Sequence, residues 1–329
     1  MNKKRGIYFF LLSIAVLLLF VADLLLGSVS FSVRELFATD MGRNILLAFR
    51  LPKAYTALIS GIALALCGLQ MQTLFRNPLA DPYILGVSSG AGLGVALYIM
   101  GITVWGVERN SLLQSLGSAG AALLGAFAVT LLIFYVSKRV KGNLTLLIFG
   151  VMIGYIASAV VSLLQYASNA HALKAYVLWT MGSFAALDSI QLIILTILIV
   201  AGVVMAVLNI KDLNAILPGE EYALSLGLNI KHIRNKILLS TTLLAGAVTA
   251  FCGPIGFLGI AVPHIARFCF KDANHRVLVP ASALFGAAVT LLADTLSELP
   301  GSGSIIPINT MAALLGIPVI IAILFRRGS

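Results

Sequence analysis

Long apolar runs separated by short polar gaps are the dominant pattern along this chain. A helix that spans a bilayer needs roughly 20 predominantly apolar residues, and ten runs of roughly that length can be marked. The pattern therefore predicts an all-α membrane protein with about ten transmembrane helices. We expect these helices at residues 7–27, 52–75, 83–101, 117–137, 144–166, 188–208, 237–253, 255–268, 277–296 and 305–325.

Two of these runs need separate interpretation. The first follows Lys3, Lys4 and Arg5 and resembles a signal peptide, but it is longer than a signal-peptide core and no A-x-A-like site follows it. We interpret it as a retained span that enters the membrane from the cytoplasm. The eighth run is short, and the Gly253-Pro254 pair before it predicts a broken or tilted helix.

The composition is that of a protein whose solvent is lipid. Hydrophobic residues make up 60% of the chain and charged residues 10%, whereas a soluble domain carries about 25% charged residues. The net charge of +10 lies in short gaps rather than on one basic face, which disfavours nucleic-acid binding. The three cysteines lack metal-site spacing, so we expect no disulfide framework, no metal and no cofactor.

Basic residues in alternate gaps predict the orientation of the chain. Of its 22 Lys and Arg residues, 16 fall on the side that holds both ends of the chain and 6 on the opposite side. Positively charged loops stay in the cytoplasm, so both termini are expected to be cytoplasmic. That placement requires an even number of spans, and the ten predicted spans satisfy it.

A short internal similarity links two of the predicted spans. Residues 61–68 and 246–253 match at both glycines, one alanine and the cysteine. The two segments lie in the second and seventh spans, five helices apart, so they would cross the membrane in opposite directions. Inverted repeats are a transporter architecture, but glycine-alanine helices also resemble one another by chance, and both explanations stay open.

The longest cytoplasmic connection, residues 209–236, predicts a short helix displayed on the cytoplasmic face. Glu220 and Glu221 would lie near the positive end of this helix, and Gly227 would close it in a left-handed conformation. Such a helix suits docking into a groove on another protein. A structured linker is the alternative.

Glycines recur at helical spacing after the second span. Two prolines break the helix within residues 76–94, and Gly86, Gly90 and Gly94 follow at intervals of four. Small residues at that spacing allow helix backbones to approach closely in lipid. The segment does not fit the G-x-G-x-x-G nucleotide-binding pattern, so helix packing is the favoured role.

A second segment of small residues, residues 252–267, combines the same features with a basic end. Gly256 and Gly259 are assigned to helix packing, as in the first segment. His264 follows a proline and could be a ligand or a proton carrier. A histidine at a helix edge that bonds backbone groups is the favoured interpretation.

Missing motifs indicate where the driving energy comes from. The chain has no G-x-x-x-x-G-K-[ST] phosphate loop, so it does not hydrolyse ATP by that route. Acidic residues within the spans are few: Asp23 and Asp294 lie toward outer ends, and Asp188 starts a span. Since ion-coupled transporters place ionisable groups in the bundle interior, energy from a partner is favoured. An ion-coupled secondary transporter is the rival, and an intramembrane enzyme is disfavoured because no catalytic constellation emerges.

Two basic residues lie on the outer side, against the general charge bias. Arg50 and Lys53 flank a Leu-Pro pair at the mouth of the second span. They could recognise an acidic surface on an external partner through charge-assisted contacts. Anchoring to lipid headgroups is an equal alternative.

These segments closely resemble the FecCD-type permease family, which includes the permeases for ferric siderophores, haem and vitamin B12. The resemblance covers nearly the whole chain, with several adjoining motifs in the family's order. The matching segments are Arg50–Lys53, Gln72–Gly94 with its core Asn77–Asp81, Leu226–Gly227, Gly256–Gly259, Pro263–His264, Arg276–Pro280, Ala293–Asp294 and Leu315–Pro318.

The resemblance implies a BtuC-like ABC importer permease fold, with one transmembrane permease domain over residues 1–329. It implies a multi-pass protein of the bacterial cytoplasmic (inner) membrane that is not itself an enzyme. The implied partners are a second permease subunit forming a homodimer, two ABC ATPase subunits, and a periplasmic or lipid-anchored substrate-binding protein. The implied cargo is a metal chelate, first of all an iron(III)-siderophore, with haem and cobalamin as open alternatives.

The resemblance also assigns roles to particular residues. The family's outer docking positions fall on Arg50 and Lys53, and its third docking position has no clear match in residues 297–304. The path walls would come from the fifth and tenth helices. The cytoplasmic gate falls on Gly142, Asn143, Leu144 and Thr145, and the ATPase-coupling segment on Glu220, Glu221, Tyr222, Ala223, Leu224, Ser225, Leu226 and Gly227.

Overall fold

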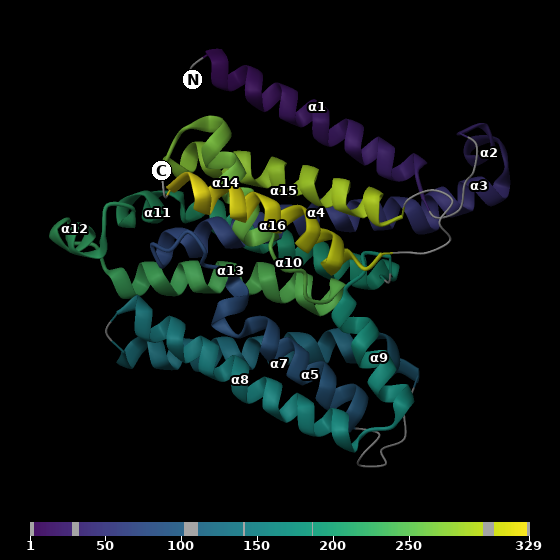
Figure 1. Ribbon diagram of the computed structural model, residues 1–329, viewed down its shortest axis with the longest axis horizontal. Coiled ribbons are helices and arrows are strands. Elements are labelled where there is room, and N and C mark those ends of the chain that lie inside the picture. Colours follow the sequence, from purple (N-terminus) through teal and green to yellow (C-terminus); the bar gives the residue numbers. More distant parts are fainter. Residues whose placement is uncertain are drawn as a thin grey trace.

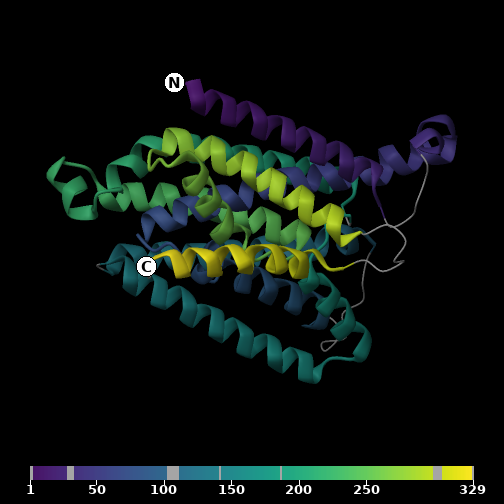
Figure 2. The same cartoon turned by 45° about the horizontal axis from the view of Figure 1, so that its top comes forward.

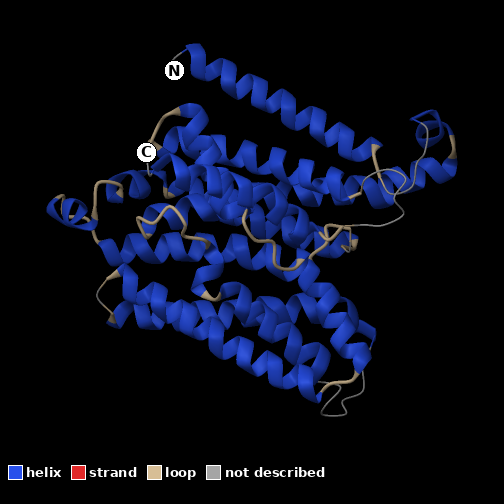
Figure 3. Cartoon of the chain, in the orientation of Figure 1, coloured by secondary structure: helices blue, strands red, loops and turns tan. Residues whose placement is uncertain are grey.

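The computed structural model describes residues 3–27, 33–101, 111–140, 142–185, 187–298 and 306–327, and within these ranges it contains helices and loops but no strand (Figure 3). The α-helices are α1 (Lys3–Leu25), α2 (Val33–Ala38), α3 (Asp40–Ile45), α4 (Leu51–Leu74), α5 (Val87–Ala96), α7 (Ser111–Arg139), α8 (Asn143–Ala167), α9 (Ala170–Met181), α10 (Ser189–Leu208), α11 (Ile210–Ile216), α12 (Glu220–Ser225), α13 (Ile230–Cys252), α14 (Leu258–Phe270), α15 (His275–Ser297) and α16 (Ile308–Arg327). Short π or 3₁₀ segments are η1 (Leu46–Arg50), η2 (Pro82–Leu85) and η3 (Leu97–Gly101).

The prediction of about ten transmembrane helices is confirmed, with one difference in length. Seven helices of the described ranges are long and apolar enough to cross a membrane. The other three predicted spans correspond to the shorter apolar helices α5 with η3, α14 and α16. The predicted span at residues 237–253 is part of α13, which begins seven residues earlier at Ile230 and extends beyond the apolar run.

Helix α14 follows a backbone break inside the bundle. Helix α13 ends at Cys252, and Gly253 has a φ of 79°, so the break predicted at the Gly-Pro pair is present. The polar groups freed by this break have partners. The backbone N–H of Ile255 donates to the Tyr83 hydroxyl at 3.0 Å, and that of Gly256 donates to Asn309 Oδ1 at 3.1 Å. Irregular backbone at membrane depth is tolerated where protein buries and satisfies it.

Both ends of the described chain lie at the same end of the bundle. The start of α1, the end of α16 and the small helices α11 and α12 are found there, and α2, α3 and α9 lie at the opposite end (Figures 1 and 2). The first end also carries most of the Lys and Arg residues. It is therefore the cytoplasmic end, as the charge pattern predicts.

Helices α4 and α13 form the centre of the bundle and pack directly against each other. Buried hydrogen bonds join them: Gln70 Nε2 donates to Ser240 Oγ at 3.2 Å, and Cys67 Sγ donates to the carbonyl of Thr241 at 3.3 Å. Small and polar side chains of this kind hold helices together in lipid, where the hydrophobic effect gives no preference for helix contact over lipid contact. The peripheral helices α1, α8 and α10 are mostly exposed.

The packing of the two central helices supports the inverted repeat. Helix α4 packs against α14 and α15, and α13 packs against α5 and α7, which are the equivalents of those helices five spans earlier. The first pair of matched glycines follows the same pattern. Gly61 of α4 meets the backbone of Gly286 in α15, and Gly246 of α13 faces Ala126 of α7.

Candidate functional site

Helix α12 is a single short helix projecting from the cytoplasmic end of the bundle (Figure 1). Gly219 turns the chain into it with a φ of 142°. Gly227 turns the chain out with a φ of 76°, as the sequence predicts. Two hydrogen bonds close its end: the N–H of Gly227 to the carbonyl of Leu224 at 2.9 Å, and the N–H of Leu228 to that of Ala223 at 3.1 Å. This pair is a Schellman motif, which satisfies carbonyls that a helix end leaves open.

The predicted coupling residues divide into an anchoring side and a displayed side. Ala223 is fully buried against the bundle. Tyr222, Leu224 and Leu226 are 53%, 59% and 57% exposed, although each is a large apolar side chain at a water-facing end of the protein. Glu221, Ser225 and Gly227 are exposed beside them. The displayed side is therefore an exposed apolar surface with an acidic margin.

Glu220 belongs to the anchoring side. Its Oε1 forms an ion pair at 3.0 Å with Nη2 of Arg234, a side chain of α13 that is almost completely buried. A movement of α12 would therefore be passed to one of the two central helices.

A second connection runs from α11 into the bundle. Asn214 Oδ1 accepts a hydrogen bond from the backbone N–H of His275 at 2.9 Å, at the start of α15. The His275 ring is 2.8 Å from the Thr73 hydroxyl of α4. The α11–α12 segment is thus tied to α4, α13 and α15.

The predicted outer docking residues are both turned into the protein. Arg50 is 9% exposed, and its Nη1 donates to the carbonyls of Leu24 and Leu25 at 3.0 and 2.8 Å. These carbonyls lie at the end of α1, where a cation also compensates the negative end of the helix dipole. Arg50 therefore attaches the outer end of α1 to the start of α4.

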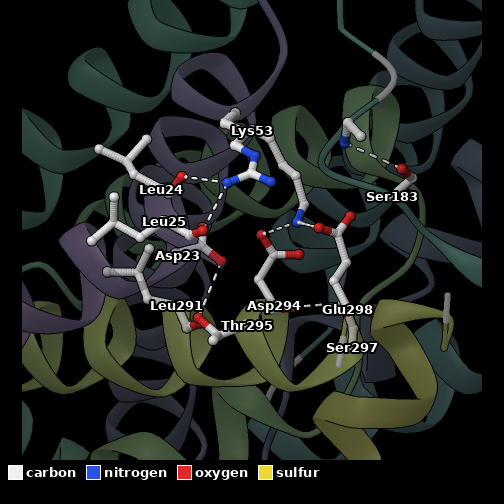
Figure 4. Close-up of polar contacts among 12 residues, drawn as sticks. Asp23, Leu24, Leu25, Lys53, Ser183, Leu291, Asp294, Thr295, Ser297 and Glu298 are labelled. Atoms are coloured by element: carbon white, nitrogen blue, oxygen red, sulfur yellow. Dashed lines mark hydrogen bonds and ion pairs between the residues drawn. The ribbon is translucent and has the colours of Figure 1, made fainter. Parts of the chain in front are cut away.

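Lys53 lies in a buried cluster of carboxylates between α1, α4 and α15. Its Nζ is 3.1 Å from Asp294 Oδ2 and 2.9 Å from Glu298 Oε2, and its side chain is 11% exposed (Figure 4). Asp23 of α1 adjoins the cluster and accepts a hydrogen bond from the Thr295 hydroxyl at 3.1 Å. Neither Arg50 nor Lys53 displays its charge on the outer face, and their docking role stays a prediction.

The three glycines of the first segment assigned to packing lie at close helix contacts. Added Cβ atoms at Gly90 and Gly94 of α5 would collide with the backbone of α7 at Gly125 and Ala121. Gly86 has a φ of 77° and faces the carbonyl of Gly150 in α8.

Gly256 and Gly259, the two packing glycines of the second segment, lie in different surroundings. Gly259 touches α4, because its own carbonyl would collide with a side chain at Gly68. Gly256 has room around it, and its role here is the hydrogen bond from its N–H to Asn309. His264 bonds the carbonyl of Pro78 through Nε2 at 2.8 Å, as the helix-edge interpretation predicts.

The predicted gate residues lie at the turn between α7 and α8 at the cytoplasmic end. Gly142 has a φ of 105°, and Asn143 begins α8. Leu144 and Thr145 are exposed in the first turn of that helix. The four residues thus lie at the cytoplasmic end of the bundle. Their role as a gate stays a prediction.

Two cavities border α9 in the outer half of the bundle, and both include Trp179. One, of about 470 Å³, lies between α9, the end of α13 and Pro307 just before α16. The other, of about 280 Å³, lies between α5, α8 and α9. Its lining is rich in neutral polar groups: Ser88, Ser89, Ser158, Ser162, Gln165, Tyr176 and Thr180.

The ten expected spans do not include α9, which lies in the outer connection between the spans expected at residues 144–166 and 188–208. The signals were present. Asn169 caps the helix by accepting a hydrogen bond from the N–H of Ala172 at 2.8 Å, and Gly182 ends it with a φ of 75°. An Asn before an apolar periodic segment and a Gly after it mark a helix, but 12 residues are too few to span a membrane and were read as loop.

The fold and these cavities define a multi-pass membrane transport protein. A model of the FecCD transport family matches residues 14–326. The hemin transport system permease protein HmuU of Yersinia pestis is 36% identical over 323 residues, which cover 97% of this chain and 95% of that protein. The vitamin B12 import system permease protein BtuC of Escherichia coli (strain SE11) is 35% identical over 318 residues, 96% of this chain and 94% of that protein.

A solved structure agrees with the sequence relatives. An inward-facing conformation of a metal-chelate type ABC transporter matches with a TM-score of 0.87 at 30% identity, over 98% of this chain and 99% of that one. The chain belongs to the FecCD transport family. It is the permease of a metal-chelate type ABC importer in the bacterial inner membrane, and so a transport component rather than an enzyme.

Proposed function

We propose that this chain carries an iron(III)-siderophore across the cytoplasmic membrane as one of two identical permease subunits. Haem and cobalamin are the alternative cargoes, since the relatives HmuU and BtuC are named for hemin and vitamin B12. All three are metal chelates. The observation that carries the ATP-driven part of the proposal is helix α12, an exposed apolar surface on a chain without its own phosphate loop. The choice of a siderophore follows from the resemblance to the FecCD family.

In this proposal, two ABC ATPase subunits bind the cytoplasmic face. Their main contact is the coupling segment, residues 220–227, with Tyr222, Leu224 and Leu226 entering a groove on the ATPase. Closure of the ATPase pair then moves α12, and the Glu220–Arg234 ion pair passes the movement to α13. The ATPase must bind one permease conformation more tightly, because a partner shifts an equilibrium only through differential affinity.

Substrate would arrive from a substrate-binding protein at the outer face and enter the path between the two permease copies. The neutral polar wall of the cavity at α5, α8 and α9 suits this task. Hydroxyl and amide groups solvate a polar chelate without holding it by charge, so the path binds weakly. The cargo would leave past Gly142–Thr145. For docking by Arg50 and Lys53, both side chains would have to leave their internal partners.

The docking surface is tested by removing its apolar side chains from the assembled transporter. Replacing both Tyr222→Ala and Leu224→Ala should weaken ATPase binding at least tenfold, because each loses about 1–2 kcal/mol of buried apolar surface. The measurement is the amount of ATPase subunit that co-purifies with the permease. Leu208→Ala is the matched control, since Leu208 is 72% exposed at the cytoplasmic end of α10, more than Tyr222 or Leu224, but lies outside α12.

Full retention of the ATPase by the double variant would exclude α12 as the main contact. The companion variant Glu220→Ala with Glu221→Ala should lower transport and substrate-stimulated ATP hydrolysis while the chain still inserts. If both stay at wild-type levels, coupling does not run through these carboxylates.

The cargo is tested with the complete transporter in proteoliposomes. Ferric siderophore, haem and cobalamin are each presented on the substrate-binding protein encoded with this permease, and uptake is measured with ATP inside. The proposal expects ATP-dependent uptake of the ferric siderophore. Uptake of only haem or cobalamin would reassign the cargo. Uptake by this chain alone on an ion gradient would replace the importer proposal with a secondary transporter.

A further inference from the structure

A cavity opens beside α1 in the cytoplasmic half of the bundle. Its volume is about 570 Å³, and its walls include Tyr8, Leu11 and Leu12 of α1, Phe270 at the end of α14, and Phe285 of α15. Helix α1 lies along one edge of the bundle in both views (Figures 1 and 2). The cavity is therefore reached from the lipid surrounding the protein rather than from the path at the centre.

Aromatic contacts fix the shape of this cavity. The Phe270 ring lies 4.6 Å from the Phe9 ring and 6.0 Å from the Tyr8 ring, measured between ring centroids. These contacts tie the first turns of α1 to the end of α14. The space between α1, α14 and α15 is thus held open by packed elements, and its volume lies in the range of about 300–1,000 Å³ that is usual for ligand sites.

The depth of the cavity matches one leaflet of a bilayer. Phe285 lies ten residues after His275, the first residue of α15, which places it about 15 Å from the cytoplasmic end of that helix. The hydrocarbon core of a bilayer is about 30 Å thick. An acyl chain of the cytoplasmic leaflet therefore has the right chemistry and the right depth to lie against Leu11, Leu12 and Phe285.

The cytoplasmic mouth of the cavity is positively charged. Lys271 lines it and forms no ion pair with another residue of the described ranges. The nearby carboxylate, Asp272, is already paired with Arg5 at 2.9 Å, and Lys4 is exposed on the same end of α1. Basic pockets between helices at the cytoplasmic side are suited to anionic lipid headgroups.

Lys271 also has an unusual backbone. It ends α14 in the left-handed conformation, with φ 47° and ψ 44°, and its N–H donates to the carbonyl of Arg267 at 2.9 Å. Glycine or asparagine is usual at such a position, because other side chains are strained there.

We propose that this cavity is a binding site for an anionic phospholipid of the cytoplasmic leaflet. One acyl chain lies along Leu11, Leu12 and Phe285, and the phosphate contacts the Lys271 ammonium. The site is separate from the ATPase-docking and transport surfaces, so it stands or falls independently of the proposed function. A second transmembrane protein in the groove is the competing occupant.

Native mass spectrometry of the purified full chain measures the headgroup preference. The chain is titrated with phosphatidylglycerol or with phosphatidylcholine of the same acyl composition. We expect phosphatidylglycerol to bind about fivefold more tightly at the first site, and Lys271→Gln to abolish that preference. Lys231→Gln is the matched control, because Lys231 is exposed in the first turn of α13 at the same end of the protein. Equal affinity for both lipids in the wild type, or a preference that survives Lys271→Gln, would overturn the proposal.

A fluorescent label on Cys269 locates the lipid. Cys269 is exposed and lines the cavity, whereas Cys67 and Cys252 are buried, so the wild-type chain carries one accessible thiol in its described part. Brominated phosphatidylglycerol should quench the label at a lower mole fraction than brominated phosphatidylcholine. Leu11→Trp fills the cavity without changing charge and should remove that difference. Absence of quenching by either lipid in the assembled transporter would show that a protein covers the groove, and would refute lipid binding there.

Discussion

The two ends of this protein use charged residues in opposite ways. At the outer end, Lys53, Asp294 and Glu298 form a buried cluster that joins α4 and α15 beside α1 (Figure 4). At the cytoplasmic end, an ion pair between the partly exposed Glu220 and the buried Arg234 holds a helix whose remaining large side chains face water. The outer cluster keeps three helices together, and the cytoplasmic end presents a short helix with an exposed apolar side.

Burial determines how much removing one partner of an ion pair costs in free energy at each end of the protein. An ion pair near the surface contributes little, typically ~0–1 kcal/mol, because water screens it. A buried pair is costly to form, but removing one partner leaves an uncompensated charge and costs about 3–5 kcal/mol. Helix α12 can therefore shift at low cost, whereas the outer cluster resists separation of α1, α4 and α15.

The largest effect is expected from removing the cation of the outer cluster. Lys53→Met leaves Asp294 and Glu298 without their shared positive partner, which should destabilise the protein by about 3–5 kcal/mol. The measurement is the thermal unfolding temperature of the purified chain in detergent. Lys174→Met serves as control, because Lys174 is exposed on α9 at the same end. Equal unfolding temperatures for the two variants would mean that the cluster does not hold the outer end.

A smaller loss is expected at the attachment of α1. Arg50→Gln removes charged hydrogen bonds to the carbonyls of Leu24 and Leu25, and such bonds contribute about 1.5–3 kcal/mol. The unfolding temperature should fall by less than in Lys53→Met. Arg43→Gln removes the same charge from an exposed side chain at that end and should leave the temperature nearly unchanged. A loss as small as that control would show that the carbonyls at the end of α1 are satisfied without Arg50.

These residues also show what could be predicted from the sequence. The spans and the helix at residues 220–227 depend on local signals, namely apolar length, a glycine at each end and acidic residues in the first turn, and the structure contains them. The partners of Arg50 and Lys53 are 25 or more residues away in sequence. Their burial could not be read from neighbouring residues, so the sequence placed both charges on the surface.

Helix α9 was missed for a different reason. Its capping signals were readable, but a search for membrane spans rejects a helix of 12 residues. The cavities beside Trp179 could not be predicted either, because their walls come from α5, α8, α9 and α13 together. A cavity formed by several helices can be located only when the three-dimensional arrangement of those helices is known.

The smallest effect is expected at the Glu220–Arg234 ion pair. Comparing it with Lys53→Met gives the sharpest contrast between the two ends of the protein. Glu220→Gln removes the charge from the ion pair with Arg234, and the Glu220 side chain is 33% exposed. After allowance for water screening, about 0.5–1 kcal/mol should be lost, which raises hydrogen exchange of the α12 amides about two- to fivefold. Global unfolding temperature should not change, unlike in Lys53→Met. Glu221→Gln is the control, because that neighbouring side chain is exposed. If hydrogen exchange in α12 rises equally in both variants, the Glu220–Arg234 ion pair does not specifically stabilise α12. If the unfolding temperature falls as far as in Lys53→Met, the contrast between a rigid outer end and a movable cytoplasmic helix is wrong.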